Sequence, residues 1–371
     1  MTKRPPRAVK TTLERLWKSA VVWSWILNGF RLAFGIIVLP LVLRVLTQAD
    51  DIVRVLRLRG IPRLIPGAEP YLFNFFLHLM QMGRLAKADV IIAHYAFSAW
   101  ALKRLAHKTI VLSHGIEWHL ENMTWDDRVH ERVAKACLEK FKLVVNDTHY
   151  LRHFGFEAPP AQGCFTELSP GKWFIPNCVD TIKFQATAGL PALKQRNIIL
   201  VPRQITADRG IDLAIKAFRL LADENKDLTL CLMGKRRPGR YLDYIEILIK
   251  DLGLGNRVFF EPDVENKRMP DYYSSALVTL IPTLRREGTS LSALESMSCG
   301  IATVSTNAAG LADLPTVQCN PDEIAVAQAL KDTLRKRTEV GLSQQETVRR
   351  IFNMKNWANA WLQVIRSVAS G

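Results

Sequence analysis

The residues best suited to do chemistry lie in one stretch, residues 285–300, between short apolar runs at 277–281 and 301–305. The apolar residues of 290–298 recur at helical spacing, and Gly300 occupies the position of a helix C-cap. The pattern therefore predicts a strand, a glycine-containing loop, a helix over 290–298 and a second strand.

The start of this helix is predicted to bind an anion. Gly288 lets the backbone approach a ligand, and the first N–H groups of a helix have no partner within the helix. Those N–H groups belong to Thr289, Ser290 and Leu291. Glu287 lies at the mouth of the loop and Glu295 about two turns along the helix, where carboxylates can accept hydrogen bonds from hydroxyl groups. The pattern indicates a ligand that carries both a diphosphate and sugar hydroxyls.

Two arginines offer a further contact for a diphosphate. Arg203 and Arg209 flank the loop that follows the apolar run 198–201. The carboxyl ends of parallel strands meet at one edge of a sheet, where ligands bind, and guanidinium groups bind phosphates strongly. For each arginine, a surface ion pair is the alternative role.

The composition is that of a globular protein with an anionic partner. The 371 residues suffice for two domains, and the formal net charge is +15. Such a charge favours a phosphorylated substrate, an acidic membrane surface or nucleic acid as partner. We expect no nucleic acid, because the basic residues are not interleaved with aromatic residues in a recognisable module. The six cysteines form no CxxC pair and have no histidine at metal-ligand spacing, so we expect a reducing compartment and no metal site.

The first 45 residues combine positive charge with apolar length. They hold eight basic residues against one acidic residue, and the most apolar part of the chain, 19–43, is interrupted by Asn28 and Arg31. Neither uncharged half of that part can span a bilayer, which needs about 20 residues. We expect residues 1–33 to lie at the cytoplasmic face of a membrane, with the basic residues on acidic headgroups. A compatible alternative is that residues 35–42 form the first buried strand of the next domain.

Strand-length apolar runs alternate with helical patterns along the rest of the chain, which is typical of parallel α/β sheets. In the first half we expect strands at 61–65, 88–94, 109–113, 143–146 and 173–176, and helices over 50–59 and 69–85. In the second half we expect strands at 198–201, 228–233, 258–261, 277–281 and 302–305, and helices over 212–223, 240–252, 269–275 and 290–298. A polar stretch at 189–194 is predicted to link the halves, and residues 357–368 to form a terminal helix.

The stretch from Glu287 to Gly300 resembles the signature of family-four retaining glycosyltransferases, which have the GT-B fold. In that family a glutamate, seven residues and a second glutamate precede a small-x-Gly turn, as Glu287, Glu295 and Ser298-Cys299-Gly300 do here. The resemblance, which holds from about Asp89 onward, implies an α/β fold of two Rossmann-like domains that face each other across a cleft. It implies an acceptor domain 34–188, a nucleotide-sugar donor domain 195–350 and a helix within 351–371 that crosses back to the first domain; the membrane-associating segment 1–33, expected from its charge and apolar length, precedes them.

The resemblance assigns roles to residues of the donor domain. Arg203 and Arg209 match an arginine and a lysine that grip the donor's phosphates, with arginine in place of the lysine and Pro202 in place of a glycine. Glu287 is expected to position the sugar and Glu295 the ribose. Gly234 is expected to lie near the nucleotide.

In the acceptor domain, His114 and the glycine after it match a His-Gly loop whose histidine lies near the transferred sugar. The next residues, Glu117, Trp118 and His119, are candidates for contact with the acceptor. His94-Tyr95 is a matching candidate at the edge of the cleft. Asn177 and Asp180 resemble a conserved turn of the family that leads toward the hinge.

These expectations predict a metal-independent, retaining glycosyltransferase without a cofactor. It would move a sugar from a nucleotide sugar to a membrane lipid or to a lipid-linked or polysaccharide glycan. The alternative is a non-catalytic, membrane-associated GT-B subunit or scaffold. That alternative follows from residues 40–47, where the glycine pair that the family normally has after its first strand is missing.

Overall fold

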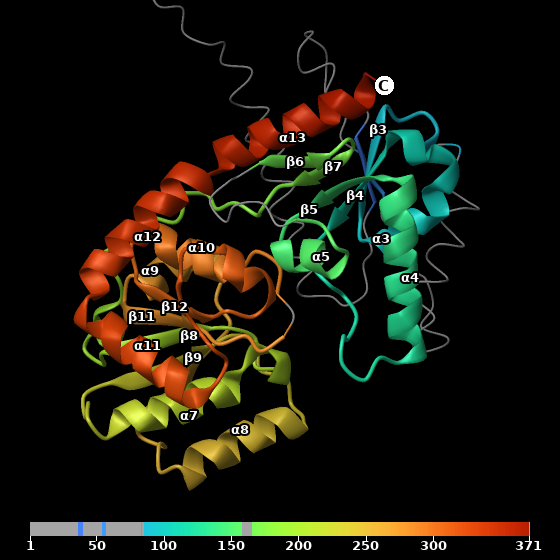
Figure 1. The fold of residues 1–371 in the computed structure, drawn as a ribbon. Coiled ribbons are helices and arrows are strands. Elements are labelled where there is room, and N and C mark those ends of the chain that lie inside the picture. The colour runs from blue at the N-terminus through green and yellow to red at the C-terminus, as the bar shows by residue number, and fades with distance from the viewer. Residues whose placement is uncertain are drawn as a thin grey trace, which may run out of the picture.

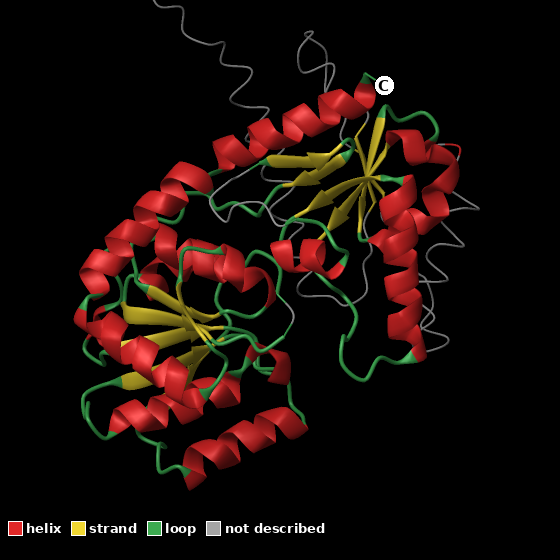
Figure 2. Cartoon of the chain, viewed as in Figure 1, coloured by secondary structure: helices red, strands yellow, loops and turns green. Residues whose placement is uncertain are grey.

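The computed structural model describes residues 83, 85–157, 165–285 and 287–370, together with two strands of backbone at 36–39 and 54–56. These residues form two α/β domains joined along one side by a long C-terminal helix, as Figure 1 shows. Each domain has helices packed on a twisted sheet (Figure 2). The predicted fold class, two Rossmann-like domains, is confirmed.

The first domain is built on a sheet with the strand order β2-β1-β3-β4-β5-β7-β6 among the described residues. Its strands are β1 Ile36–Leu39, β2 Arg54–Leu56, β3 Val90–His94, β4 Thr109–Ser113, β5 Lys142–Val145, β6 Thr166–Ser169 and β7 Lys172–Phe174. Its helices are α3 Ala96–Ala99, the 3₁₀ helix Trp100–Lys108, α4 Trp125–Lys140 and α5 Thr148–His153. The strands expected near 88–94, 109–113, 143–146 and 173–176 are present as β3, β4, β5 and β7.

The edges of this sheet differ from the prediction. β3, β4, β5 and β7 run parallel, whereas β1 pairs antiparallel with both β2 and β3, and β6 pairs antiparallel with β7. The prediction of a helix over 50–59 is wrong at the centre of that range, because β2 lies there and Val55 pairs with Ile37. Pairing with β1 supplies the backbone partners that a helix would have supplied internally. The strand expected at 61–65 and nearly all of the helix expected over 69–85 lie outside the described residues.

The central strands are apolar along their whole length because both faces of the sheet are covered. On one face Ile91, Val111 and Leu143 pack with residues of α4. This helix starts at a capping box, in which Thr124 Oγ1 accepts from Asp127 N, 3.2 Å away, and the Asp127 carboxylate accepts from Thr124 N at 2.8 Å.

The second domain has a wholly parallel sheet with the order β10-β9-β8-β11-β12-β13 among the described residues. Its strands are β8 Ile198–Pro202, β9 Thr229–Met233, β10 Val258–Glu261, β11 Ala276–Ile281, β12 Thr303–Thr306 and β13 Val317–Cys319. Its helices are α6 Pro191–Lys194, α7 Ile211–Ala222, α8 Arg240–Asp251, α9 Met269–Tyr273, α10 Leu291–Ser298, α11 Glu323–Arg335 and α12 Arg337–Ile351. The strands and helices predicted for residues 198–305 are all present within a few residues, whereas β13, α11 and α12 were not predicted.

Alternate residues of β8 face opposite cores. Ile199 and Val201 pack with α7, α8 and α11, and Ile198 and Leu200 pack with α9, α10 and α12. The expected polar linker at 189–194 contains the one-turn helix α6 instead. Its proline stands at the first helical position, and Leu193 is buried in the second of these cores.

The C-terminal helix α13, Met354–Ala369, crosses back to the first domain as predicted (Figure 1). It begins at Asn353, whose side chain accepts from Asn356 N at 2.9 Å. Trp361, Val364 and Val368 then pack on the face of the first sheet opposite α4. In the part of the chain that the structure describes, none of the helices combines the length and the apolar character needed to cross a membrane. The segment 1–33 lies outside the described residues.

Candidate active site

The predicted residues of the second domain gather where its parallel strands end. Arg203 follows β8, Gly234 follows β9, and the loop with Glu287 lies between β11 and α10. Because β8 lies between β9 and β11, the three loops are neighbours at the carboxyl edge of the sheet.

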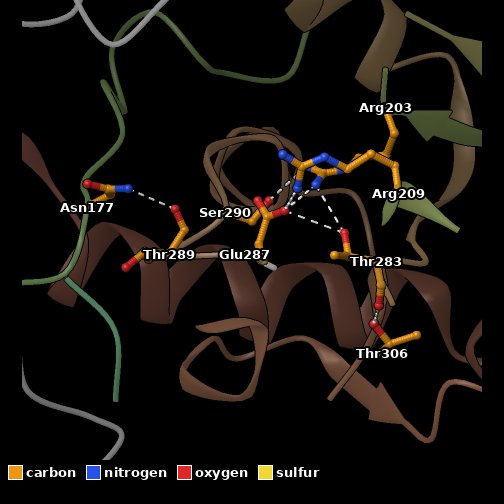
Figure 3. A network of polar contacts seen from close by, with 8 residues as sticks. All are labelled: Asn177, Arg203, Arg209, Thr283, Glu287, Thr289, Ser290 and Thr306. Carbon is orange, nitrogen blue, oxygen red and sulfur yellow. Dashed lines mark hydrogen bonds and ion pairs between the residues drawn. The ribbon is translucent and has the colours of Figure 1, made fainter. Parts of the chain in front are cut away.

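One carboxylate joins both arginines at this edge. Glu287 Oε2 accepts from Arg203 Nη2 and from Arg209 Nη1 (Figure 3). Arg203 Nη2 also donates to Thr283 Oγ1 at 3.0 Å, and Arg203 Nη1 to Ser290 Oγ at 3.4 Å. The structure therefore unites the predicted phosphate-binding arginines with the predicted sugar-positioning glutamate in one cluster.

Arg203 is buried and the side chain of Glu287 is only 10% exposed, yet both are charged. Burial by itself raises the pKa of Glu287, but the charges of Arg203 and Arg209 bring that pKa below its usual value. Burial lowers the pKa of Arg203, and Glu287 counteracts this shift. The Nε–H group of Arg203 is buried and has no hydrogen-bond partner among the described residues. With two cations against one anion and an unused N–H donor, the cluster can bind a further anion.

The helix predicted to point at this anion is α10, with Ser290 as its N-cap residue. Thr289 and Ser290 are almost fully buried, while Leu291, the first residue of the helix, is partly exposed. The hydroxyl of Ser290 accepts from Arg203 and does not cap the helix. The N–H groups at the start of the helix and the arginines thus lie side by side, at the positive end of the helix dipole.

The loop of Gly288 approaches the first domain closely. A Cβ atom on Gly288 would lie 2.8 Å from the carbonyl oxygen of His114, and one on Gly310 would lie 2.6 Å from the carbonyl carbon of Gly288. The sequence predicted that Gly288 lets the backbone approach a ligand, but the close contact in the structure is with the loop of His114. Gly234 has a similar role: a Cβ there would lie 2.3 Å from the carbonyl oxygen of Arg203, so the glycine lets two main chains touch.

Several residues that join the domains at this place were not predicted as part of the site. Asn177 Nδ2 donates to the carbonyl oxygen of Thr289 at 2.8 Å (Figure 3), and Thr289 Oγ1 donates to the carbonyl oxygen of Asn146. The carboxylate of Asp313 accepts from the amide and the hydroxyl of Thr148, with 2.7 Å to the amide nitrogen. The available signal was that Asn146 and Thr148 follow the strand β5, at the same sheet edge as His114.

Glu295 lies deeper along α10, among different partners. Its Oε2 accepts from the hydroxyl of Tyr273 at 2.9 Å and its Oε1 from Asn266 Nδ2 at 3.4 Å. Burial raises the pKa of this carboxyl group to about 7. A carboxylate offers about four lone-pair positions, so these two bonds leave acceptor capacity for the hydroxyls of a ligand. No sequence pattern pointed to Tyr273 or Asn266.

His114 is paired with His94 in the first domain. Nε2 of His114 lies 2.7 Å from Nδ1 of His94, and the ring of Tyr95 lies 4.9 Å from that of His114, centre to centre. Burial is the main cause that lowers the pKa of His114 to about 3, and the nearby His94 lowers it further. The ring is therefore neutral at physiological pH. Gly115 after it has φ +106°, which favours glycine. The predicted histidine and its predicted neighbour at the cleft edge therefore form one unit.

The candidates for acceptor contact after His114 do not behave alike. Trp118 is only 4% exposed and packs against Tyr150 and Phe154 in the core, so its prediction as an acceptor contact is wrong. His119 is half exposed but lies 3.2 Å from the capping carboxylate of Asp127. Burial raises the pKa of Glu117 to about 8, so this carboxyl group is largely protonated at neutral pH.

Comparison with known proteins finds similarity concentrated in the second domain. Residues 185–318, which hold the arginines and both glutamates, match the family of glycosyl transferases group 1. A GDP-mannose-dependent alpha-(1-6)-phosphatidylinositol monomannoside mannosyltransferase of Mycolicibacterium smegmatis is 24% identical over 205 residues, 49% of this chain and 52% of the relative. A D-inositol 3-phosphate glycosyltransferase of Nocardiopsis dassonvillei is 29% identical over 136 residues, 34% of this chain and 30% of the relative. The chain thus spans about a third to a half of the length of these relatives.

The fold is shared over a longer stretch. Sucrose-phosphate synthase from Thermosynechococcus elongatus superposes with a TM-score of 0.69 at 21% identity, over 84% of this chain and 82% of that protein. The Anabaena protein HepE, solved in complex with UDP and glucose, superposes with a TM-score of 0.64 at 15% identity, over 78% of this chain and 81% of that protein. The chain has the GT-B fold, and its second domain carries the match to the glycosyl transferases group 1 family.

Proposed function

We propose that the protein is a retaining glycosyltransferase that takes its sugar from a nucleotide diphosphate sugar. The observation that supports this most directly is the cluster of Arg203, Arg209 and the N-terminus of α10 at the carboxyl edge of the sheet. All three favour negative charge, and the departing nucleoside diphosphate carries the charge that develops in the transition state.

The proposed chemistry assigns each group a task. Arg203 and Arg209 stabilise the departing diphosphate, and the buried Nε–H of Arg203 is available to one of its oxygens. A phosphate oxygen of the donor accepts the proton of the acceptor hydroxyl on the same face of the sugar, so no protein nucleophile is required. Glu287 must then exchange part of its contact with the arginines for a sugar hydroxyl. Glu295 accepts from the ribose hydroxyls.

The names of the relatives indicate which donors and acceptors to test first. One structural neighbour was solved with UDP and glucose, and one relative is named as GDP-mannose-dependent, so UDP and GDP sugars are the donors to test first. The relative from M. smegmatis is named for a phosphatidylinositol monomannoside. We propose a membrane lipid or a lipid-linked glycan as acceptor, reached from the cytoplasmic face of an anionic membrane through residues 1–33.

The alternative is a non-catalytic GT-B subunit, which the missing glycine pair at residues 40–47 suggests. A measurement of turnover distinguishes the enzyme from this alternative. We expect the purified chain to release nucleoside diphosphate from a UDP or GDP sugar in the presence of lipid acceptors. Arg203→Ala should lower that rate roughly ten- to a hundredfold, because a lost charge-assisted contact costs about 1.5–3 kcal/mol. The control is Arg237→Ala, an exposed arginine on the neighbouring loop. Nucleotide binding without turnover under every donor and acceptor would favour the scaffold.

Glu287→Gln should separate binding from turnover. The carboxylate occupies the arginines that the diphosphate needs. Removing its charge relieves a like-charge repulsion of about 1 kcal/mol, so UDP or GDP should bind roughly fivefold more tightly. Turnover should fall, because the sugar loses its charged partner. Calorimetry with the free diphosphates measures the first effect, and weaker binding by the variant would show that Glu287 does not compete with the ligand.

Glu295 predicts how donor affinity depends on pH. Its pKa is raised to about 7 by burial, so the acceptor form, the carboxylate, is complete above that pH and is lost as the pH falls through it. The affinity for the intact nucleotide sugar should therefore rise with pH through about 7 and then level off. Glu295→Gln should bind more weakly and lack this step. A step of the same size in Glu295→Gln would assign the titration to another group.

The N-terminal segment should hold the protein on anionic vesicles. The first 45 residues carry +7 of the +15 formal charge, and each basic residue near an acidic leaflet contributes about 1 kcal/mol. Removing residues 1–33 should release the protein in co-sedimentation while donor binding in the second domain persists. High salt should release the intact chain only partly, because apolar burial is not screened. If the shortened chain sediments as well as the intact one, the anchor lies elsewhere; if it unfolds, the segment belongs to the core.

A further inference from the structure

The two histidines at the carboxyl edge of the first sheet are in hydrogen-bonding geometry. His94 ends β3 and His114 follows β4, the next parallel strand. The nitrogens, Nδ1 of His94 and Nε2 of His114, are 2.7 Å apart, the ring centres are 5.0 Å apart and the planes differ by 18°. The distance between the ring centres exceeds the distance between the nitrogens by about the sum of the two ring radii, which is the value expected when each nitrogen lies on the line that joins the centres. The rings therefore lie end to end in nearly one plane, as a linear N–H···N bond requires.

This bond couples the tautomers of the two rings. Only one proton can lie between the two nitrogens, so one ring donates and the other accepts. If His114 donates, both rings are in the Nε2–H form, which is the more stable tautomer of a free neutral imidazole side chain. If His94 donates, both rings must take the less stable Nδ1–H form. The first arrangement also leaves Nδ1 of His114 as an acceptor.

Two further features fit a constrained site at this position. Tyr95, between the end of β3 and α3, has φ +72°, a strained value for a residue that is not glycine. Its amide donates to the carbonyl oxygen of Leu112 at 2.9 Å, and this contact ties the strained residue to the strand that carries His114. The other titratable groups near the pair are Glu117, in the loop of His114, and Asp147, whose Oδ2 lies 3.3 Å from a Cβ placed on Gly115.

We propose that His94 is a positioning residue for His114. It accepts the Nε2–H of His114 on its own Nδ1 and thereby fixes both the orientation and the tautomer of the ring. His114 then meets the transferred sugar as a neutral imidazole whose Nδ1 accepts a hydrogen bond from a sugar hydroxyl. This inference rests on the proposed function for the last step, whereas the pairing itself can be tested without any turnover.

Nitrogen-15 NMR of the histidine-labelled full chain tests the pairing directly. The signals of His114 are assigned by their loss in His114→Gln. In the unmodified protein they should show a protonated Nε2 and an unprotonated Nδ1. His94→Asn should preserve that pattern, because the amide oxygen can accept from the place of Nδ1. His94→Leu should replace it by exchange between tautomers, and the control His130→Leu, a histidine that packs on Phe97, should leave it unchanged. A protonated Nδ1 in the unmodified protein, or an unchanged pattern in His94→Leu, overturns the proposal.

Kinetics then tests the consequence for the sugar. His94→Leu should lower kcat about tenfold, the effect of one lost hydrogen bond, and leave the affinity for the free nucleoside diphosphate unchanged, because that ligand binds the second domain. His94→Asn should restore most of the loss. His94→Asp should shift the pKa of His114 in the opposite direction. A carboxylate beside Nε2 should raise this pKa into the range where NMR detects an imidazolium. Equal rates in His94→Leu and the unmodified enzyme, or no change in the pKa of His114 in His94→Asp, contradict the proposal. If no variant turns over, the proposed function has failed, and the NMR result still decides the pairing.

Discussion

A buried arginine needs a partner, and the geometry of the proposed donor site follows from how Arg203 is paired. Its side chain is 8% exposed, and its guanidinium bonds to Glu287, Thr283 and Ser290, all in the loop between β11 and α10. Thr283 is held in turn by Thr306, whose hydroxyl donates to its carbonyl oxygen. The loop is therefore fixed by the charge that it surrounds, and breaking one side of such a pair is costly because the other charge stays buried. An anionic ligand is the natural substitute, since it can replace the carboxylate without leaving the arginine unpaired.

The same loop is shaped by the first domain. Gly288 lies under the carbonyl oxygen of His114 and Gly310 lies on Gly288, so side chains there would hold the domains apart. Closure also has a cost, because Asn146 Oδ1 and Asp147 Oδ2 are buried without a hydrogen-bond partner among the described residues. The contacts of Thr148 with Asp313 and of Asn177 with Thr289 offset that cost. The two domains thus complete the site together, and neither contains all of it.

The sequence predicted what depends on local pattern. The helix of Glu295 and the alternation of strands in the second half follow from apolar spacing, and the position of Arg203 after a parallel strand follows from the sheet rule. The crossing of the C-terminal helix was expected from the family resemblance alone. Contacts over long separations carry no such pattern. Nothing in the spacing of Glu287 shows that its carboxylate pairs with Arg209, 78 positions away, or that Thr148 meets Asp313. The segment at 54–56 was missed for a related reason, because its strand depends on β1 as a partner and not on its own periodicity.

The two sides of the site differ in charge in a way that suits the proposed transfer. The second domain contributes cations and a helix N-terminus, which favour the departing diphosphate. The first domain contributes an imidazole pair that burial keeps neutral, with the pKa of His94 lowered to about 4 and that of His114 to about 3. Positive charge develops on the sugar carbon as its bond to the diphosphate breaks, and an imidazolium beside it would oppose that charge. A neutral ring can hold a hydroxyl of the sugar without this repulsion. The neutral histidines and the cationic N–H donors of the arginines are therefore two parts of one electrostatic arrangement, in which each side of the site matches the charge that forms next to it.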